Sequence, residues 1–184
     1  MPRFERLPTP VKEAILTVAR DHFARDGKDA ASFNQIIADA GISKTSAYHY
    51  FDGKDDLFAA VAADAALRTL AILGPWQEAS TVQEIWRQVA EGSTSLLTYL
   101  RKNPEDRAVL AAAAQLNTEA DPWIQAFVAN VVDLGLSTDD DGWLSTVTAA
   151  LFAAADRWAL NHPGLPDEQV ADRLVSVLRR AMTA

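Results

Sequence analysis

Apolar residues recur along the chain at the three- and four-residue spacing of a helix, and no stretch sustains the alternation of a strand. The first apolar stripe shares one helical face and is formed by Val11, Ile15, Val18, Ala19 and Phe23. Glycine, proline and polar clusters separate the periodic segments. The pattern predicts an all-α protein with about nine helices, at residues 9–27, 32–41, 44–51, 54–67, 81–102, 105–116, 122–135, 142–161 and 166–182.

Capping residues mark the starts of the first three helices. A proline follows Thr9, so Thr9 is expected to cap a helix whose first position is proline. Gln35 follows Ser32 by three positions, which predicts a capping box in which each side chain bonds the other residue's backbone N–H. Gly41 can take a positive φ in the next turn, and Ser43 can cap the helix after it. Two short helices joined by such a turn form a helix-turn-helix.

The third helix carries four ring side chains in a row, at positions 48–51. Successive side chains on a helix point about 100° apart, so these rings divide between two faces. One face is expected to pack on the first two helices and consists of Ala47, Tyr50 and Phe51. The opposite face is expected to point outward and consists of Thr45, Tyr48 and His49. In a helix-turn-helix, the outward face of the second helix enters the DNA major groove.

The residues on and beside this outward face carry groups that suit DNA. Thr45 and Ser46 can exchange hydrogen bonds with base edges, and the Thr45 methyl group can contact a thymine methyl group. Tyr48 and His49 can bond phosphate oxygens, which position a helix without specifying sequence. Lys54 opens the fourth helix, where free N–H groups and the helix dipole favour an anion.

These residues together resemble the N-terminal domain of the TetR family of bacterial transcriptional regulators. The resemblance covers residues 10–60 and rests on AILTVARDHFARDG, the capped helix from Ser32 to Ile36, AGIS, YHYF and the following Lys54. Family members are typically all-α homodimers that repress transcription until a small ligand binds their C-terminal domain. Asp52 departs from the usual pattern by placing a negative charge near the DNA backbone.

The resemblance implies a helix-turn-helix DNA-binding domain at residues 1–53 and a helical ligand-binding and dimerisation domain at residues 54–184. The implied partners are a double-stranded DNA operator, a second copy of the chain and an unidentified small-molecule ligand, with no cofactor. The DNA contacts that follow from it are Ser43, Lys44, Thr45, Ser46, Tyr48, His49 and Lys54.

The net charge of −8 argues against a protein that coats nucleic acid through a broad basic surface. Residues 1–60 hold 8 basic and 9 acidic residues, whereas residues 61–184 hold 9 basic and 16 acidic residues. All five tryptophans lie in the acidic part. The two parts are therefore expected to serve different partners, and DNA binding is expected to rest on a few placed contacts.

The acidic part carries two further candidate sites. Ligand pockets are largely apolar with a few placed polar groups. This composition suggests a cavity lined by Trp86, Tyr99, Gln115, Asn117, Trp123 and Phe127, with ordinary core packing as the alternative. The last two helices carry apolar faces that are expected to pair with their symmetry mates in a four-helix interface. These faces are formed by Trp143, Val147, Leu151, Phe152, Trp158, Val170, Leu174, Val177 and Leu178.

Other functional classes find little support in the sequence. No apolar run is long enough to span a membrane, and the charged residues near the start are unlike a secretory signal, so a cytoplasmic protein is expected. There is no cysteine, and the three histidines lie on separate elements, so no metal site is expected. The acidic loop at residues 137–142 lacks the glutamate that a calcium loop needs. Nothing nominates an enzyme nucleophile. The alternative to a regulator is a helical interaction protein that no longer binds a specific operator.

Overall fold

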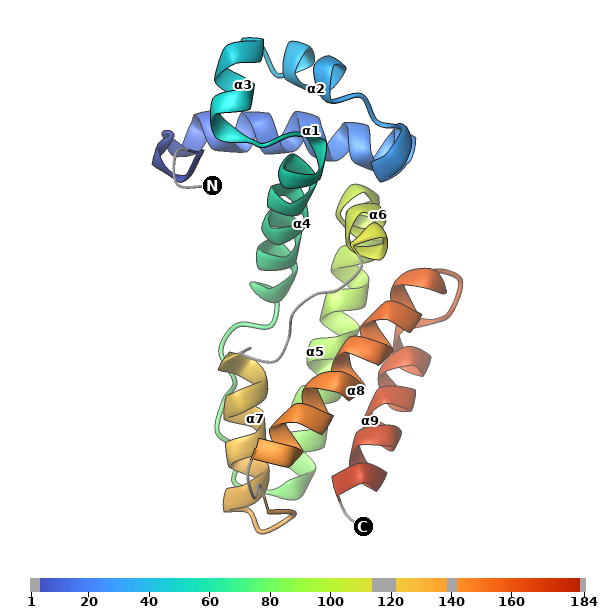
Figure 1. The fold of residues 1–184 in the computed structure, drawn as a ribbon. Helices are drawn as coiled ribbons and strands as arrows, with labels where there is room; N and C mark the ends of the chain where they lie inside the picture. The colour runs from blue at the N-terminus through green and yellow to red at the C-terminus, as the bar shows by residue number, and fades with distance from the viewer. Residues whose placement is uncertain (1–3, 114–121, 139–141, 183–184) are drawn as a thin grey trace. The chain divides into compact units, whose positions relative to one another are not determined.

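The computed structural model describes residues 4–113, 122–138 and 142–182. Within these ranges the chain forms a short 3-10 helix at Phe4–Arg6 and nine α-helices, with no strand (Figure 1). The first four α-helices are α1 Thr9–Ala30, α2 Phe33–Asp39, α3 Lys44–Tyr50 and α4 Lys54–Leu70. The other five are α5 Val82–Lys102, α6 Pro104–Ala112, α7 Pro122–Asp133, α8 Trp143–Asn161 and α9 Asp167–Met182. The all-α prediction is confirmed.

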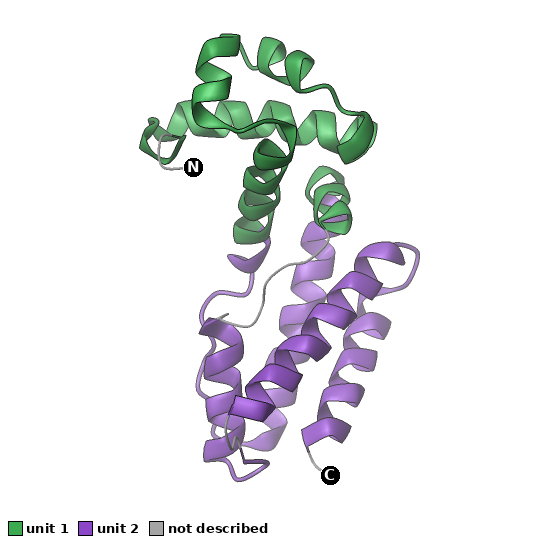
Figure 2. Ribbon diagram, in the orientation of Figure 1, with its two compact units in different colours: residues 1–68, 103–114 green, residues 69–102, 115–184 purple. Residues whose placement is uncertain are grey.

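The chain divides into two compact units (Figure 2). Unit 1 consists of residues 1–68 and 103–114, and unit 2 consists of residues 69–102 and 115–184. Unit 1 therefore includes α6, although α5, which precedes α6 in the sequence, belongs to unit 2. The predicted functional boundary after residue 53 concerns which residues bind DNA, and it stays a prediction.

The first helix follows its predicted stripe in part. Ile15, Ala19 and Phe23 are buried, whereas Val11, in the first turn of the helix, is 41% exposed. Pro8 rather than Thr9 occupies the cap position, because the Pro8 carbonyl accepts the first helical hydrogen bonds and Thr9 is already helical. The predicted break at Gly27 is confirmed by its φ of 77°, after which one more helical turn reaches residue 30.

Unit 1 is held by an aromatic core and by one buried charge cluster. Phe4 packs on Phe51 with ring centroids 4.8 Å apart, and Phe23 packs edge-on against Phe58 at 5.1 Å. Asp106 on α6 is only 3% exposed. Its carboxylate accepts hydrogen bonds of 2.5 Å and 3.2 Å from the Arg68 guanidinium on α4, and it forms an ion pair of 3.6 Å with Arg20 on α1.

Unit 2 has its own core, built from the inner faces of α5, α7, α8 and α9. It includes Ile85, Trp86, Val89, Phe127, Val128, Val131, Leu144, Ala149, Leu178 and Met182. The buried Asn130 amide ties the segment between α4 and α5 to α7. Its Oδ1 accepts hydrogen bonds from Trp76 Nε1 at 3.0 Å and from the Ala79 N–H at 2.6 Å, and its Nδ2 donates to the Ala79 carbonyl at 3.0 Å. No helix in the described ranges is both long and apolar enough to cross a membrane.

Candidate nucleic-acid interface

The helix α2 begins at a half-formed capping box. Ser32 Oγ accepts a hydrogen bond from the Gln35 N–H at 3.4 Å, as predicted. The reciprocal bond is not made by Gln35, whose Nε2 donates instead to Asp39 Oδ1, one turn further along, at 2.8 Å. The prediction that both backbone donors are capped is therefore wrong for the second one: the Gln35 side chain extends along α2 to Asp39, and its oxygen does not accept from the Ser32 N–H.

The turn between α2 and α3 has the geometry that the sequence predicts. Gly41 has a φ of 68°, which glycine adopts without strain. The Ile42 N–H donates to the Ile37 carbonyl at 3.1 Å, so the turn also satisfies the end of α2. Ser43 then caps α3: its Oγ accepts from the Ser46 N–H at 3.1 Å and donates to Ser46 Oγ at 2.9 Å.

The two faces of α3 separate as the helical wheel predicts. Ala47 and Phe51 are fully buried and Tyr50 is half-buried, so they anchor the helix to the core of unit 1. Tyr48 is 53% exposed. The remaining predicted DNA contacts on this helix are exposed or, for Ser46, half-buried: Ser43, Lys44, Thr45, Ser46 and His49. Their side chains thus lie on one accessible surface that starts at the N-terminal end of α3.

Phe33 supports this surface and was not singled out by the sequence. Its ring packs on that of Tyr48 with centroids 5.3 Å apart and planes tilted by 59°. The contact joins the first residue of α2 to the exposed face of α3, so Tyr48 has a defined position although it is exposed. The only local signal is that an aromatic residue directly follows the Ser32 cap.

Lys54 has an additional partner. Its ammonium donates to the Asp29 carbonyl, beyond the Gly27 break in α1, at 2.5 Å. An ammonium carries three hydrogens, so this bond still leaves donors for a phosphate. The Lys28 ammonium, by contrast, forms an ion pair with Asp55 Oδ1 at 3.2 Å and lies 5.1 Å from the centre of the Phe58 ring. Asp52 is exposed, and its N–H donates to Asp56 Oδ2 at 3.2 Å.

This arrangement of capped helix, glycine turn and exposed reading face coincides with a known family. Residues 15–61 match the model of the bacterial regulatory proteins of the tetR family. The match covers most of α1, all of α2 and α3, and the start of α4, so this part of the chain is similar to the N-terminal domain of the tetR family. No curated protein matches it significantly.

Solved structures of TetR-like regulators share the fold over nearly the whole chain. A regulator from Rhodococcus sp. RHA1 is 24% identical with a TM-score of 0.56, covering 97% of this chain and 100% of that one. A TetR-family regulator from Streptomyces coelicolor A3 is 20% identical with a TM-score of 0.62, covering 97% and 99%. One from Haemophilus influenzae RD is 19% identical with a TM-score of 0.65, covering 95% and 97%. The chain therefore has the fold of a TetR-family transcriptional regulator, with an N-terminal helix-turn-helix.

Three of the residues predicted to line a ligand cavity, Trp86, Trp123 and Phe127, pack together in unit 2. Trp86 and Phe127 are buried in the core of unit 2. Trp123 is half-buried and stacks on Phe127, with centroids 5.9 Å apart and planes within 8° of parallel. Tyr99 is half-buried on α5. Gln115 and Asn117 lie outside the described residues, so their part in a cavity stays a prediction.

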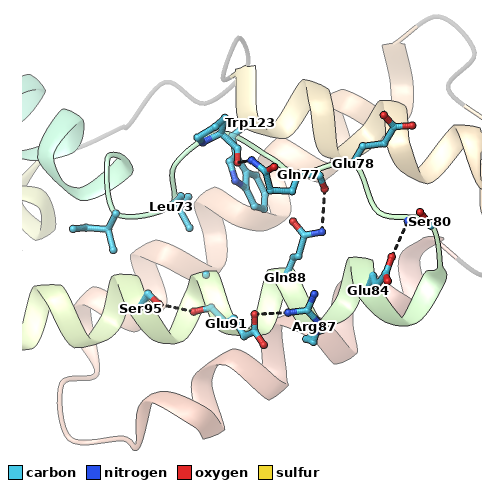
Figure 3. A pocket seen from close by; sticks show the side chains of 13 residues that line it. Leu73, Gln77, Glu78, Ser80, Glu84, Arg87, Gln88, Glu91, Ser95 and Trp123 are labelled. Carbon is cyan, nitrogen blue, oxygen red and sulfur yellow. Dashed lines mark hydrogen bonds and ion pairs between the residues drawn. The ribbon is translucent and has the colours of Figure 1, made fainter.

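An open groove of about 610 Å³ lies beside these aromatic residues, between α5 and the segment that precedes it (Figure 3). Of the predicted cavity residues that the structure describes, Trp123 alone lines it. Its walls are mostly polar, and two of its carboxylates already have partners: Glu84 accepts from the Ser80 N–H and Glu91 from Arg87, each at 2.8 Å. Gly92 allows the segment to approach, because a Cβ there would lie 2.9 Å from Leu73 Cδ2.

The predicted dimer face is uneven in exposure. Trp143, at the start of α8, is 72% exposed, and Val177 on α9 is 50% exposed. Leu178 is fully buried in the core of unit 2, so its side chain stabilises the protomer itself. The other predicted interface residues are half-buried: Val147, Leu151, Phe152, Trp158, Val170 and Leu174.

Proposed function

We propose that this chain is a homodimeric transcriptional repressor, in which α3 reads a palindromic operator and a small-molecule ligand causes release. The observation that carries the proposal is the geometry of α3. Ser43 caps its N-terminus, Ala47 and Phe51 anchor it, and its opposite face is left accessible. A DNA-reading helix needs this combination, because base edges are contacted by the N-terminal residues of a helix held rigidly from behind.

The proposed contacts divide by chemistry. Thr45 and Ser46 approach base edges, where hydroxyl and methyl groups distinguish sequences. Tyr48 and His49 bond phosphate oxygens, while Lys44 and Lys54 supply positive charge. Ser43 adds a hydroxyl at the helix start. Because residues 1–60 have no excess of basic residues, affinity depends on these few groups.

The proposed dimer pairs α8 and α9 of one protomer with those of its partner. The exposure of Trp143 and Val177 supports this face, since large apolar side chains left in water favour burial. A two-fold dimer would present two α3 helices to successive major grooves, roughly 34–36 Å apart. The operator is therefore a near-palindrome, and the protein acts where DNA is accessible, in the cytoplasm.

The proposed ligand binds in unit 2. Two buried polar atoms there support a ligand site, because Trp86 Nε1 and Thr148 Oγ1 find no hydrogen-bond partner among the described residues. Buried donors and acceptors are normally satisfied, so each atom is suited to bond a bound molecule or water. A ligand that releases DNA must bind the DNA-free conformation more tightly, by the coupling free energy between the two sites.

Selection of genomic DNA fragments by the purified protein tests the proposal, with an enriched palindrome as the expected result. On that operator and its variants, Lys54→Ala should weaken binding to all sequences equally. It should also lower the slope of the logarithm of affinity against the logarithm of salt concentration by about one. Tyr48→Ala should weaken binding to all sequences equally and leave this salt dependence unchanged. Thr45→Val should change base preference in each half-site by about 1–3 kcal/mol. Lys102→Ala, an exposed lysine at the end of α5, serves as the control.

A helical interaction protein that has lost operator binding is the second candidate. The observation that favours it is the internal hydrogen bond between Lys54 and the Asp29 carbonyl, which occupies one of the three ammonium donors and holds the side chain against its own chain. This candidate predicts that no sequence is enriched. Equal affinity of the wild type and Tyr48→Ala for every fragment would support it and overturn α3 as the reading helix.

A further inference from the structure

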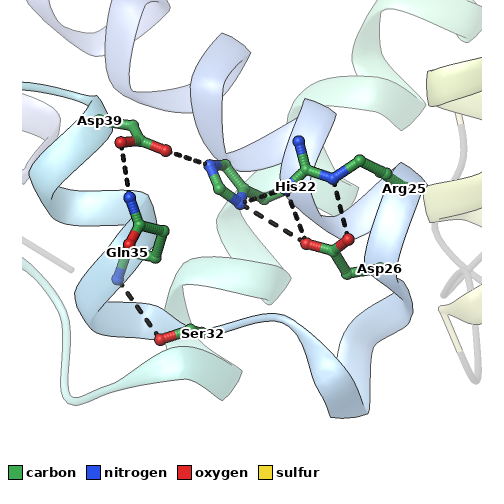
Figure 4. Close-up of polar contacts among 6 residues, drawn as sticks. All are labelled: His22, Arg25, Asp26, Ser32, Gln35 and Asp39. Atoms are coloured by element: carbon green, nitrogen blue, oxygen red, sulfur yellow. Dashed lines mark hydrogen bonds and ion pairs between the residues drawn. The ribbon is translucent and has the colours of Figure 1, made fainter.

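His22 is a polar residue in the apolar half of α1. It is only 6% exposed, and it lies on the same helical face as the buried residues Ala19 and Phe23. Buried polar side chains in folded proteins are hydrogen-bonded. Both ring nitrogens of His22 satisfy this rule: Nε2 lies 2.8 Å from Asp39 Oδ2 on α2, and Nδ1 lies 2.9 Å from Arg25 Nη2 on α1 (Figure 4).

The two partners fix the protonation state of the ring. A carboxylate only accepts hydrogen bonds and a guanidinium only donates them. Nε2 must therefore carry a hydrogen and donate it to Asp39, whereas Nδ1 must be bare to accept from Arg25. The hydrogen-bond partners therefore match the Nε2–H tautomer.

The groups around the ring are themselves held in place. Arg25 donates to both oxygens of Asp26, at 2.9 Å from Nε and 2.8 Å from Nη2, which fixes the guanidinium beside Nδ1. These bonds lower the pKa of Asp26 and raise that of Arg25. On α2, the hydrogen bond from His22 lowers the pKa of Asp39, with a smaller contribution from Gln35.

A second proton on His22 would have no comparable partner. It would place an N–H at Nδ1 opposite the donating Arg25 Nη2. The nearest carboxylate oxygen is Asp26 Oδ2, at 3.7 Å, and it already accepts a hydrogen bond from Arg25. The groups that face the ring from α1 and α2 thus match an Nε2–H that donates and an Nδ1 that accepts.

We propose that His22 is a positioning residue, which pins α2 to α1 through Asp39 and thereby sets how α3 is presented to DNA. The DNA part of this inference rests on the proposed function. Only residues 40–43 separate α2 from α3, and the turn is held by backbone bonds to α2. A shift of α2 on α1 therefore moves the N-terminal end of α3, where base contacts require close placement.

The pin is tested without DNA by two measurements. Nitrogen-15 NMR of the imidazole at neutral pH should show a hydrogen on Nε2 of His22, and an Nδ1–H tautomer with a bare Nε2 would overturn the link between His22 and Asp39. Amide hydrogen exchange in α2 should be faster in His22→Leu than in the wild type and close to wild type in His22→Gln, which keeps a donor toward Asp39. Unchanged exchange in His22→Leu would also overturn it.

Operator binding tests the consequence for α3. His22→Leu should weaken operator binding about tenfold with the salt slope unchanged, since a hydrogen bond to a charged group is lost but no phosphate contact is. His22→Gln should recover most of that loss, and Asp21→Asn, an exposed neighbour on α1, should have no effect. Equal affinity of His22→Leu and wild type would overturn the positioning role.

These measurements still test the proposal if a variant fails to fold or if no operator is found. If His22→Leu does not fold, Asp39→Asn takes its place in the exchange and affinity measurements, with the same expected direction. If the selection enriches no operator, the proposed function fails, whereas the tautomer and the exchange rates still confirm or overturn the pin.

Discussion

Several single residues hold α3 in place although they do not belong to its exposed face. Phe33 fixes the ring of Tyr48, the Asp29 carbonyl binds the Lys54 ammonium, and Gly41 turns the chain into α3. Each acts through one local property: ring packing, a carbonyl acceptor or a permitted backbone angle. Changes at such residues are expected to affect stability and presentation of α3 together.

Gly41 offers the clearest backbone test. Its φ is 68°, and a Cβ at this position would meet nothing within 4 Å, so any cost of a side chain is conformational and not a collision. Gly41→Ala should lower the free energy of unfolding by about 1–2 kcal/mol. Gly41→Asn should cost less, because asparagine tolerates the left-handed region. Urea denaturation measures both, and equal losses would contradict the conformational explanation.

Asp39 predicts a specific dependence of stability on pH. Because its pKa is lowered in the folded state by His22 and Gln35, ionised Asp39 favours folding. That contribution is complete above the ordinary carboxyl pKa of about 3.9 and is lost as the pH falls through the lowered folded value. Urea denaturation of wild type and Asp39→Asn should therefore show a difference that is constant near neutral pH and shrinks below about pH 4. A difference that does not change with pH would contradict this origin.

At the scale of helices, the sequence best predicted the features that depend on residues close together in the chain. The turn at Gly41, the Ser43 cap and the two faces of α3 all follow from residues a few positions apart, and the structure bears them out. The capping box at Ser32 formed only by half, because the Gln35 side chain extends along the helix to Asp39 instead of back to the Ser32 N–H. Local patterns identify possible hydrogen bonds, but the direction that the side chain takes decides which one forms.

The Ser43 cap makes a prediction for α3 as an element. Ser43→Ala removes the acceptor for the Ser46 N–H and should lower the free energy of unfolding by about 1 kcal/mol. Ser32→Ala should cost less, since its bond to the Gln35 N–H is 3.4 Å long. Ser95→Ala is the control: that hydroxyl bonds the Glu91 carbonyl inside α5, where alanine is the better helix former. A loss at Ser95 equal to that at Ser43 would show that capping is not the cause.

At the scale of the whole molecule, the sequence could not predict that α6 belongs to unit 1. The helix itself was expected from periodicity, but its partners α1 and α4 lie far from it in the chain. Asp106 reads in sequence as an ordinary acidic residue in the first turn of a helix. Its burial between two arginines follows only from tertiary packing. The same holds for the groove in unit 2, which is lined mainly by polar residues that the sequence did not select.

Asp106 is therefore expected to be the most sensitive charged residue of unit 1. Asp106→Ala leaves the half-buried guanidinium groups of Arg20 and Arg68 without this carboxylate, and removal of one partner from a buried ion pair costs about 3–5 kcal/mol. The loss should lie near the lower end, because Arg68 keeps its ion pair with Asp64. Glu105→Ala, an exposed residue on the same helix, should change stability by less than about 0.5 kcal/mol.

A double-mutant cycle locates the interaction. Coupling of Asp106 with Arg68 should exceed its coupling with Arg20, since Arg68 makes two hydrogen bonds, at 2.5 Å and 3.2 Å, whereas Arg20 lies at 3.6 Å. Urea denaturation of the single and double variants with Arg68→Met and Arg20→Met gives both coupling energies. If Asp106→Ala were as stable as Glu105→Ala, the carboxylate would not hold α6 to α1 and α4, and the apolar contacts of Val109 and Leu110 would have to do so alone.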